Sequence, residues 1–152
     1  MKQTASRQRG FTLIEMMIVV GIVAILAAVA LPFYQDTIRR GKLVDVAVRL
    51  GDFRTQQEKW FLDNRTYQAV PPSGSNCGIP NPPVGASDPF QIICSAPTAT
   101  TYIVTATGRT AGGMDPLFVY TVDQANVRAS SGPTGWSPGT GCWAVRKDGS
   151  CQ

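Results

Sequence analysis

The chain has 152 residues, a length that suits one domain, with a formal net charge of +4 and no histidine. The lack of histidine removes the commonest metal ligand and the commonest general base. Three basic side chains (Lys2, Arg7 and Arg9) precede a long apolar segment, and the remaining basic and acidic side chains nearly balance. This balance weakens any argument for nucleic-acid binding from bulk charge. No arrangement of a nucleophile beside a base can be recognised in the sequence either. We therefore expect that the chain is not an enzyme and that it binds no cofactor or metal.

The apolar segment, Phe11–Leu31, is twenty-one residues long and contains two polar residues, Thr12 and Glu15. A bilayer core about 30 Å thick needs roughly 20 helical residues, so the segment is long enough to span a membrane. No small-residue cleavage region follows Leu31, which indicates that the segment is retained rather than removed as a secretory leader. The basic residues before it favour a cytoplasmic N-terminus.

Glu15 is the unusual residue of this segment. An ionised carboxylate in a spanning helix costs on the order of 2–4 kcal/mol, so such a group usually has a partner. Two interpretations follow: Glu15 pairs with a cation from another subunit, or it lies shallow enough to reach water at the membrane interface.

The segment Gly10–Glu15, with a short basic leader before it and an apolar run that ends at Leu31-Pro32, resembles the type IV pilin signature. The resemblance implies that a prepilin peptidase removes residues 1–10 by cutting after Gly10 and methylates the new terminus at Phe11. Glu15 would then pair with the terminal amine of a neighbouring subunit, and each charge would relieve the desolvation cost of the other. Residues 11–31 would form the transmembrane and filament-core helix, and residues 32–152 the periplasmic head.

Beyond Pro32, which removes a helical hydrogen-bond donor and bends a helix axis, the apolar residues form a stripe with spacings of three and four. Its members are Leu43, Val46, Ala47, Leu50, Phe53, Gln57, Trp60 and Phe61. This pattern predicts an amphipathic helix with one face in a core. The opposite, solvated face is expected to carry Arg40, Asp45, Arg49, Asp52, Arg54, Glu58 and Lys59. The helix is expected to end at residues 63–65.

The remainder of the head predicts strands. After a loop rich in proline and glycine at residues 71–88, residues 90–95, 101–107 and 117–123 are rich in aromatic and β-branched residues, and residues 127–130 form a possible fourth strand. Residues 131–141 are expected to be irregular. A helix followed by strands predicts an α+β fold, with a small antiparallel sheet of three to four strands packed on the long helix.

Four cysteines lie in the C-terminal half of the chain, and none forms a CxxC pair. In a small extracytoplasmic head they predict two structural disulfides, with a cysteine-only metal site as the alternative. Sequence proximity favours Cys77–Cys94 and Cys142–Cys151, while the other two connectivities stay open.

The head also resembles the minor pilins of the PilE and ComP type. The resemblance rests on residues 57–67, residues 101–108 and the pair Cys142-Trp143, and the tail beyond Trp143 departs from it. It implies a minor structural subunit, inserted in the inner membrane and then assembled into an extracellular filament that serves adhesion, twitching motility or DNA uptake. The implied partners are other pilins, the prepilin peptidase and the assembly platform.

Two alternatives remain. ComP recognises extracellular DNA, so the basic and aromatic residues of this head are candidate DNA contacts, against the simpler interpretation of a solvated turn. These candidates are Arg109, Arg128, Trp143, Arg146 and Lys147. A type II secretion pseudopilin shares the helix signature, but such heads often bind calcium through clustered acidic residues, whereas Asp115 and Asp123 are isolated here.

Overall fold

The computed structural model describes residues 11–70 and 77–151. The predicted leader, including the predicted cleavage position Gly10, lies outside the described residues. Helix α1 extends over Leu13–Asn64 and continues through Pro32. A boundary between two compact units falls after Ile38, so the helix contributes to both units.

In the first unit, the apolar side chains of α1 are exposed along the predicted membrane segment. This helix is long and apolar enough to cross a membrane by length and composition, and none of its most apolar window is buried within the protein. An exposed apolar surface of this extent is characteristic of a membrane or a helix interface rather than of a solvated surface.

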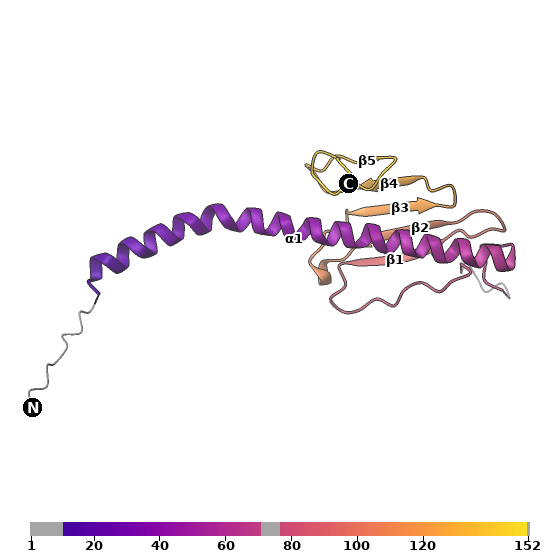
Figure 1. Ribbon diagram of the computed structural model, residues 1–152, viewed down its shortest axis with the longest axis horizontal. Helices are drawn as coiled ribbons and strands as arrows, with labels where there is room; N and C mark the ends of the chain where they lie inside the picture. The colour runs from indigo at the N-terminus through magenta and orange to yellow at the C-terminus, as the bar shows by residue number, and fades with distance from the viewer. Residues whose placement is uncertain (1–10, 71–76, 152) are drawn as a thin grey trace, which may run out of the picture. The chain divides into compact units, whose positions relative to one another are not determined.

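The head, which begins at Arg39, contains an antiparallel sheet whose strands lie side by side in chain order (Figure 1). The elements are β1 (Phe90–Ser95), β2 (Ile103–Gly108), the short 3-10 helix η1 (Thr110–Gly112), β3 (Val119–Asp123), β4 (Arg128–Ser131) and β5 (Gly139–Thr140). The α+β class and the antiparallel sheet on the long helix are confirmed.

The strand number was predicted too low, because β5 lies in a stretch that we expected to be irregular. Gly139 and Thr140 carry no alternating apolar pattern, so local sequence gives no signal for this strand. A buried serine on β4 organises it instead: Ser130 Oγ accepts hydrogen bonds from the backbone N–H groups of Gly139, at 3.2 Å, and Ala144, at 2.9 Å.

The core lies between one face of α1 and the inner face of the sheet. The predicted helix stripe is buried at Leu43, Val46, Leu50, Phe53 and Gln57. Alternate residues of the strands face them, because side chains of a strand point in turn to opposite faces of the sheet. The strand and pre-strand residues buried there include Phe90, Ile92, Tyr102, Val104, Tyr120 and Val122.

Gln57 is a fully buried polar residue within this core. Its Nε2 donates a hydrogen bond to the carbonyl oxygen of Tyr67 at 2.9 Å, and its Oε1 accepts one from the backbone N–H of Ile79 at 3.2 Å. A single side chain thus ties the chain on both sides of residues 71–76 to the helix.

We expect Gln57→Leu, a substitution of similar size, to lower the free energy of unfolding by about 2 kcal/mol, because it removes two hydrogen bonds and leaves the backbone N–H of Ile79 unpaired, while the Tyr67 carbonyl oxygen keeps the bond from the Gly78 N–H. Chemical denaturation of the full chain in detergent micelles measures the loss. The control is Gln56→Leu, since Gln56 is the next residue on the helix and is exposed. Equal losses in the two variants would contradict the role given to Gln57.

Candidate functional sites: the assembly segment and the C-terminal loop

Thr12 caps the beginning of α1. Its Oγ1 accepts a hydrogen bond from the backbone N–H of Glu15 at 3.3 Å, and its carbonyl oxygen accepts the first helical bond from Met16 at 3.3 Å. A threonine in this position satisfies one of the backbone donors that every helix start leaves open. The cap places Glu15 in the first turn, where its exposed carboxylate pairs with no cation among the described residues.

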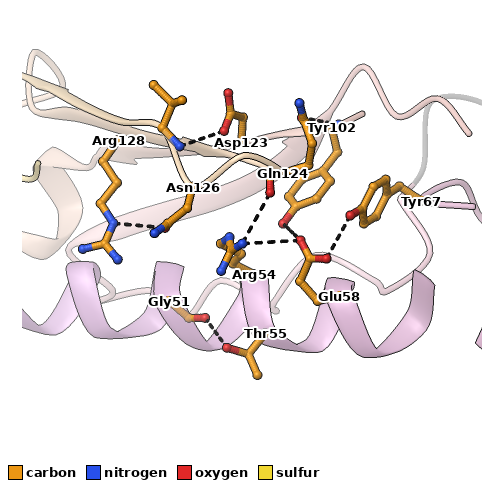
Figure 2. A network of polar contacts seen from close by, with 11 residues as sticks. Gly51, Arg54, Thr55, Glu58, Tyr67, Tyr102, Asp123, Gln124, Asn126 and Arg128 are labelled. Carbon is orange, nitrogen blue, oxygen red and sulfur yellow. Dashed lines mark hydrogen bonds and ion pairs between the residues drawn. The ribbon is translucent and has the colours of Figure 1, made fainter. Parts of the chain in front are cut away.

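A polar network joins α1 to the sheet and to the segment after the helix (Figure 2). Glu58 accepts hydrogen bonds from the hydroxyl groups of Tyr67, at 2.9 Å, and Tyr102, at 3.3 Å. Arg54 lies 3.8 Å from the Glu58 carboxylate and donates to the carbonyl oxygen of Gln124 at 3.4 Å. Arg54 and Glu58 were predicted on the solvated face, so the structure corrects their placement: both are half-buried.

The two tyrosines of this network stay protonated over the physiological pH range. Burial, reinforced by the hydrogen bond to Glu58, raises the pKa of Tyr67 to about 12. Burial is also the largest cause that raises the pKa of Tyr102 above its ordinary value. Both hydroxyl groups therefore donate to the carboxylate, and the network fastens the helix to its surroundings rather than presenting a reactive acid or base.

The structure joins the cysteines in the pairs that sequence proximity favoured. Cys77 is bonded to Cys94, with Cα atoms 6.0 Å apart, and Cys142 is bonded to Cys151, with Cα atoms 6.1 Å apart. The first disulfide is buried and fixes the segment after the helix to β1. The second closes residues 143–150 into a loop near the C-terminus.

Arg146 and Lys147 are exposed on this C-terminal loop. The loop turns at Asp148, whose carboxylate accepts a hydrogen bond from the backbone N–H of Ser150 at 2.9 Å. Hydrogen bonds from Ser150 are the main cause that lowers the pKa of Asp148, and Arg146 adds to the effect. The exposed loop therefore carries two cations next to a carboxylate that is ionised at neutral pH.

Trp143 was a candidate DNA contact from the sequence, but the structure buries it. The residue is only 8% exposed, and its indole N–H donates to the carbonyl oxygen of Thr121 at 2.9 Å. The guanidinium of Arg128 covers the ring, 4.5 Å from its centre. An aromatic ring packed in this way is part of the core, so it is no platform for a base.

The structure brings Arg128 and Trp143 together but separates Arg109 from them. Arg109 directly follows β2, beside the first residue of β1, whereas Arg128 opens β4 opposite Val122, at the other end of the sheet. Arg109 donates hydrogen bonds to the carbonyl oxygens of Gly85, at 2.7 Å, and Asp88, at 3.1 Å. Its guanidinium thus holds a loop in place.

Within residues 11–70 and 77–151, no group of three or more acidic, cysteine or histidine side chains could hold a metal ion. All four cysteines are in disulfides. The sites that remain are thus the assembly segment at the start of α1 and the surface of the head.

A long apolar helix that begins beside a single carboxylate, followed by a small disulfide-linked head, defines a filament subunit of the pilin class. Residues 5–31 match the prokaryotic N-terminal methylation motif, and residues 32–115 match the family described as type IV minor pilin ComP, DNA uptake sequence receptor. The chain belongs to the type IV pilin family.

Individual relatives agree with this assignment. The chain is 35% identical over 132 residues to prepilin peptidase-dependent protein D of Escherichia coli (strain K12), which covers 86% of this chain and 82% of that protein. It is 30% identical over 141 residues to a fimbrial protein of Pseudomonas aeruginosa, which covers 86% and 92%. The type IV major fimbrial protein FimA of Dichelobacter nodosus is 50% identical over 60 residues, 40% of this chain and 38% of FimA. No solved structure matches the chain.

Membership in this family indicates how the chain is processed and where it is assembled. The N-terminal motif and the apolar helix are those of a membrane-anchored precursor that is processed by a prepilin peptidase. The processed chain assembles with other pilins into an extracellular pilus.

Proposed function

We propose that this chain is a minor structural subunit of a type IV pilus and that it has no enzymatic activity. The observation that carries the proposal is the order of two matched segments: the methylation motif at residues 5–31 is followed directly by a minor-pilin head from residue 32. Adhesion, twitching motility and DNA uptake then belong to the filament that the subunit helps to build.

In this proposal the three parts of the chain have separate tasks. Residues 1–10 are the leader, which the peptidase removes at Gly10. Residues 11–31 hold the precursor in the inner membrane and later pack in the filament core, with Glu15 paired to the methylated Phe11 amine of a neighbour. Residues 32–152 form the head, and the assembly platform transfers the subunit from the membrane into the fibre.

A strain that lacks the prepilin peptidase tests this pathway. Without the enzyme, the chain should stay in the inner membrane as the longer precursor and be absent from filaments sheared off the cell surface. Restoring the enzyme should return the shorter form to the filament fraction. Appearance of the uncut chain in filaments would contradict the proposal.

We propose DNA binding by the head as a second candidate function, favoured by the match to a family described as a DNA uptake sequence receptor. The match ends at residue 115, so the C-terminal loop is outside it. The exposed cations of that loop, Arg146 and Lys147, would contact phosphates.

If the loop binds DNA, the double substitution of Arg146 and Lys147 by alanine should weaken binding about tenfold at low salt and flatten its salt dependence, because two phosphate contacts are lost. Fluorescence anisotropy of the full chain in detergent with duplex DNA measures this. The matched control replaces two exposed cations elsewhere in the head, Lys59 and Arg65, by alanine. If the affinity for DNA falls equally in both variants, or in neither, the loop does not bind DNA through Arg146 and Lys147.

A further inference from the structure

A groove follows one flank of α1 in the head and encloses about 320 Å³. The helix supplies Val44, Ala47, Val48 and Gly51 to one wall, and Arg128 and Val145 are part of the other. All of these residues belong to the same compact unit. Val48 leaves 57% of its surface exposed, so the groove has an open apolar side.

Arg128 is the single charged residue among those that line this groove. Its guanidinium lies on the Trp143 ring, and its Nε donates to the side chain of Asn126 at 3.2 Å (Figure 2). The two terminal nitrogens have no hydrogen-bond partner among the described residues. An arginine held on two sides, with free donors, is prepared for a carboxylate because little side-chain freedom remains to be lost on binding.

The helix residues that line this groove are uncharged, unlike those that line a second groove on α1. Arg49 and Asp52 line a different groove, beside Pro80, Pro82 and Pro83. The helix wall next to Arg128 is therefore uncharged. An apolar wall beside one cation fits a partner that presents an aliphatic side chain next to a carboxylate, and the volume suits the tip of a turn rather than a whole helix.

This chain presents that chemistry at the turn before β3. Leu117 is 60% exposed, and Asp115 beside it is exposed and accepts a hydrogen bond from the Leu117 backbone N–H at 2.8 Å. The turn lies at the start of β3, whereas Arg128 pairs with Val122 near its end. Because the two features are at opposite ends of the strand, the turn is not placed to enter its own groove.

We infer that the groove beside Arg128 receives an acidic–aliphatic turn of a neighbouring pilin subunit, a turn of the kind that Asp115–Leu117 forms in this chain. The inference rests on the proposed filament function and names one of its contacts. A contact between two different surfaces of similar subunits does not close on itself and so generates an open helical array, which is the geometry of a fibre.

Two glycines of α1 give a matched test. A Cβ atom added at Gly51 or at Gly41 would meet no atom within 4 Å, so the fold accepts a side chain at either position. Gly51 lines the groove, while Gly41 does not. Replacement of either residue by leucine raises the intrinsic helix propensity by a similar amount, so a difference between the two variants reports on the groove and not on the fold.

We expect Gly51→Leu to lower the amount of this chain in sheared filaments about tenfold, a loss equivalent to about 1.4 kcal/mol of contact energy, while Gly41→Leu changes it less than twofold. A photo-reactive residue in place of Val48 should form a cross-link in those filaments to a pilin peptide that carries the acidic–aliphatic turn. Quantitative mass spectrometry measures both.

Normal incorporation of Gly51→Leu, or a cross-link from position 48 to a protein that is not a pilin, would overturn the inference and leave the filament function standing. Absence of the unmodified chain from filaments would overturn the filament function, and the inference with it.

Discussion

Replacing Glu15 with glutamine should remove the chain from filaments almost completely, with a fall of about 100-fold or more, although the precursor is still made and inserted. The physical reason is the charge left behind. Breaking a buried ion pair by removing one partner costs about 3–5 kcal/mol, because the other charge stays buried without compensation. If Glu15 pairs with the Phe11 amine of a neighbour, that cost falls on the assembled fibre and not on the membrane precursor.

The measurement is the ratio of this chain in sheared filaments to the chain in membranes, taken for the Glu15→Gln variant and for Asp45→Asn. Asp45 is an exposed carboxylate on the same helix, within the head. Its variant should assemble nearly normally, since a solvated carboxylate contributes little. Normal assembly of the Glu15 variant would show that the carboxylate reaches water, the alternative that the sequence leaves open.

Removal of the Cys77–Cys94 disulfide by serine substitution of both residues should lower the free energy of unfolding by about 3 kcal/mol on the chain-entropy account. The bond spans 17 residues, and both cysteines are buried in the core. This disulfide holds the same segment that the Gln57 side chain ties to the helix. Its loss should therefore free the chain between α1 and β1. Chemical denaturation of the full chain in detergent measures the effect.

The second disulfide is the natural comparison. Cys142–Cys151 spans 9 residues, and its two cysteines are only half-buried, so the corresponding double serine variant should lose less stability and leave the sheet protected from hydrogen exchange. If both double variants lose the same stability and the same exchange protection, the central role given to the buried disulfide is wrong.

Local patterns in the sequence were sufficient to predict the first strand and the end of the long helix. The first strand occupies the predicted residues, 90–95, because it alternates between buried and exposed residues. The helix ends at Asn64, within the predicted 63–65, and Arg65 follows with a positive φ of 57°. Where one face is buried and a turn signal follows, the pattern and the structure have the same cause.

Contacts between distant residues were not predictable in the same way. Glu58 was expected on the solvated face, yet its partner Tyr102 is 44 residues away. Trp143 was a candidate DNA contact, but Arg128 and the backbone of β3 enclose it. No local periodicity reports such pairs, because they depend on which elements pack together. The groove beside Arg128 could not be predicted from the sequence for the same reason.

Mass spectrometry of filaments sheared from the native host tests the central claim most directly. We expect a mature peptide that begins at N-methylated Phe11, present at a low ratio to a major pilin, which would establish both processing and a minor-subunit role. Detection of the processed chain in membranes, but never in filaments, would contradict it.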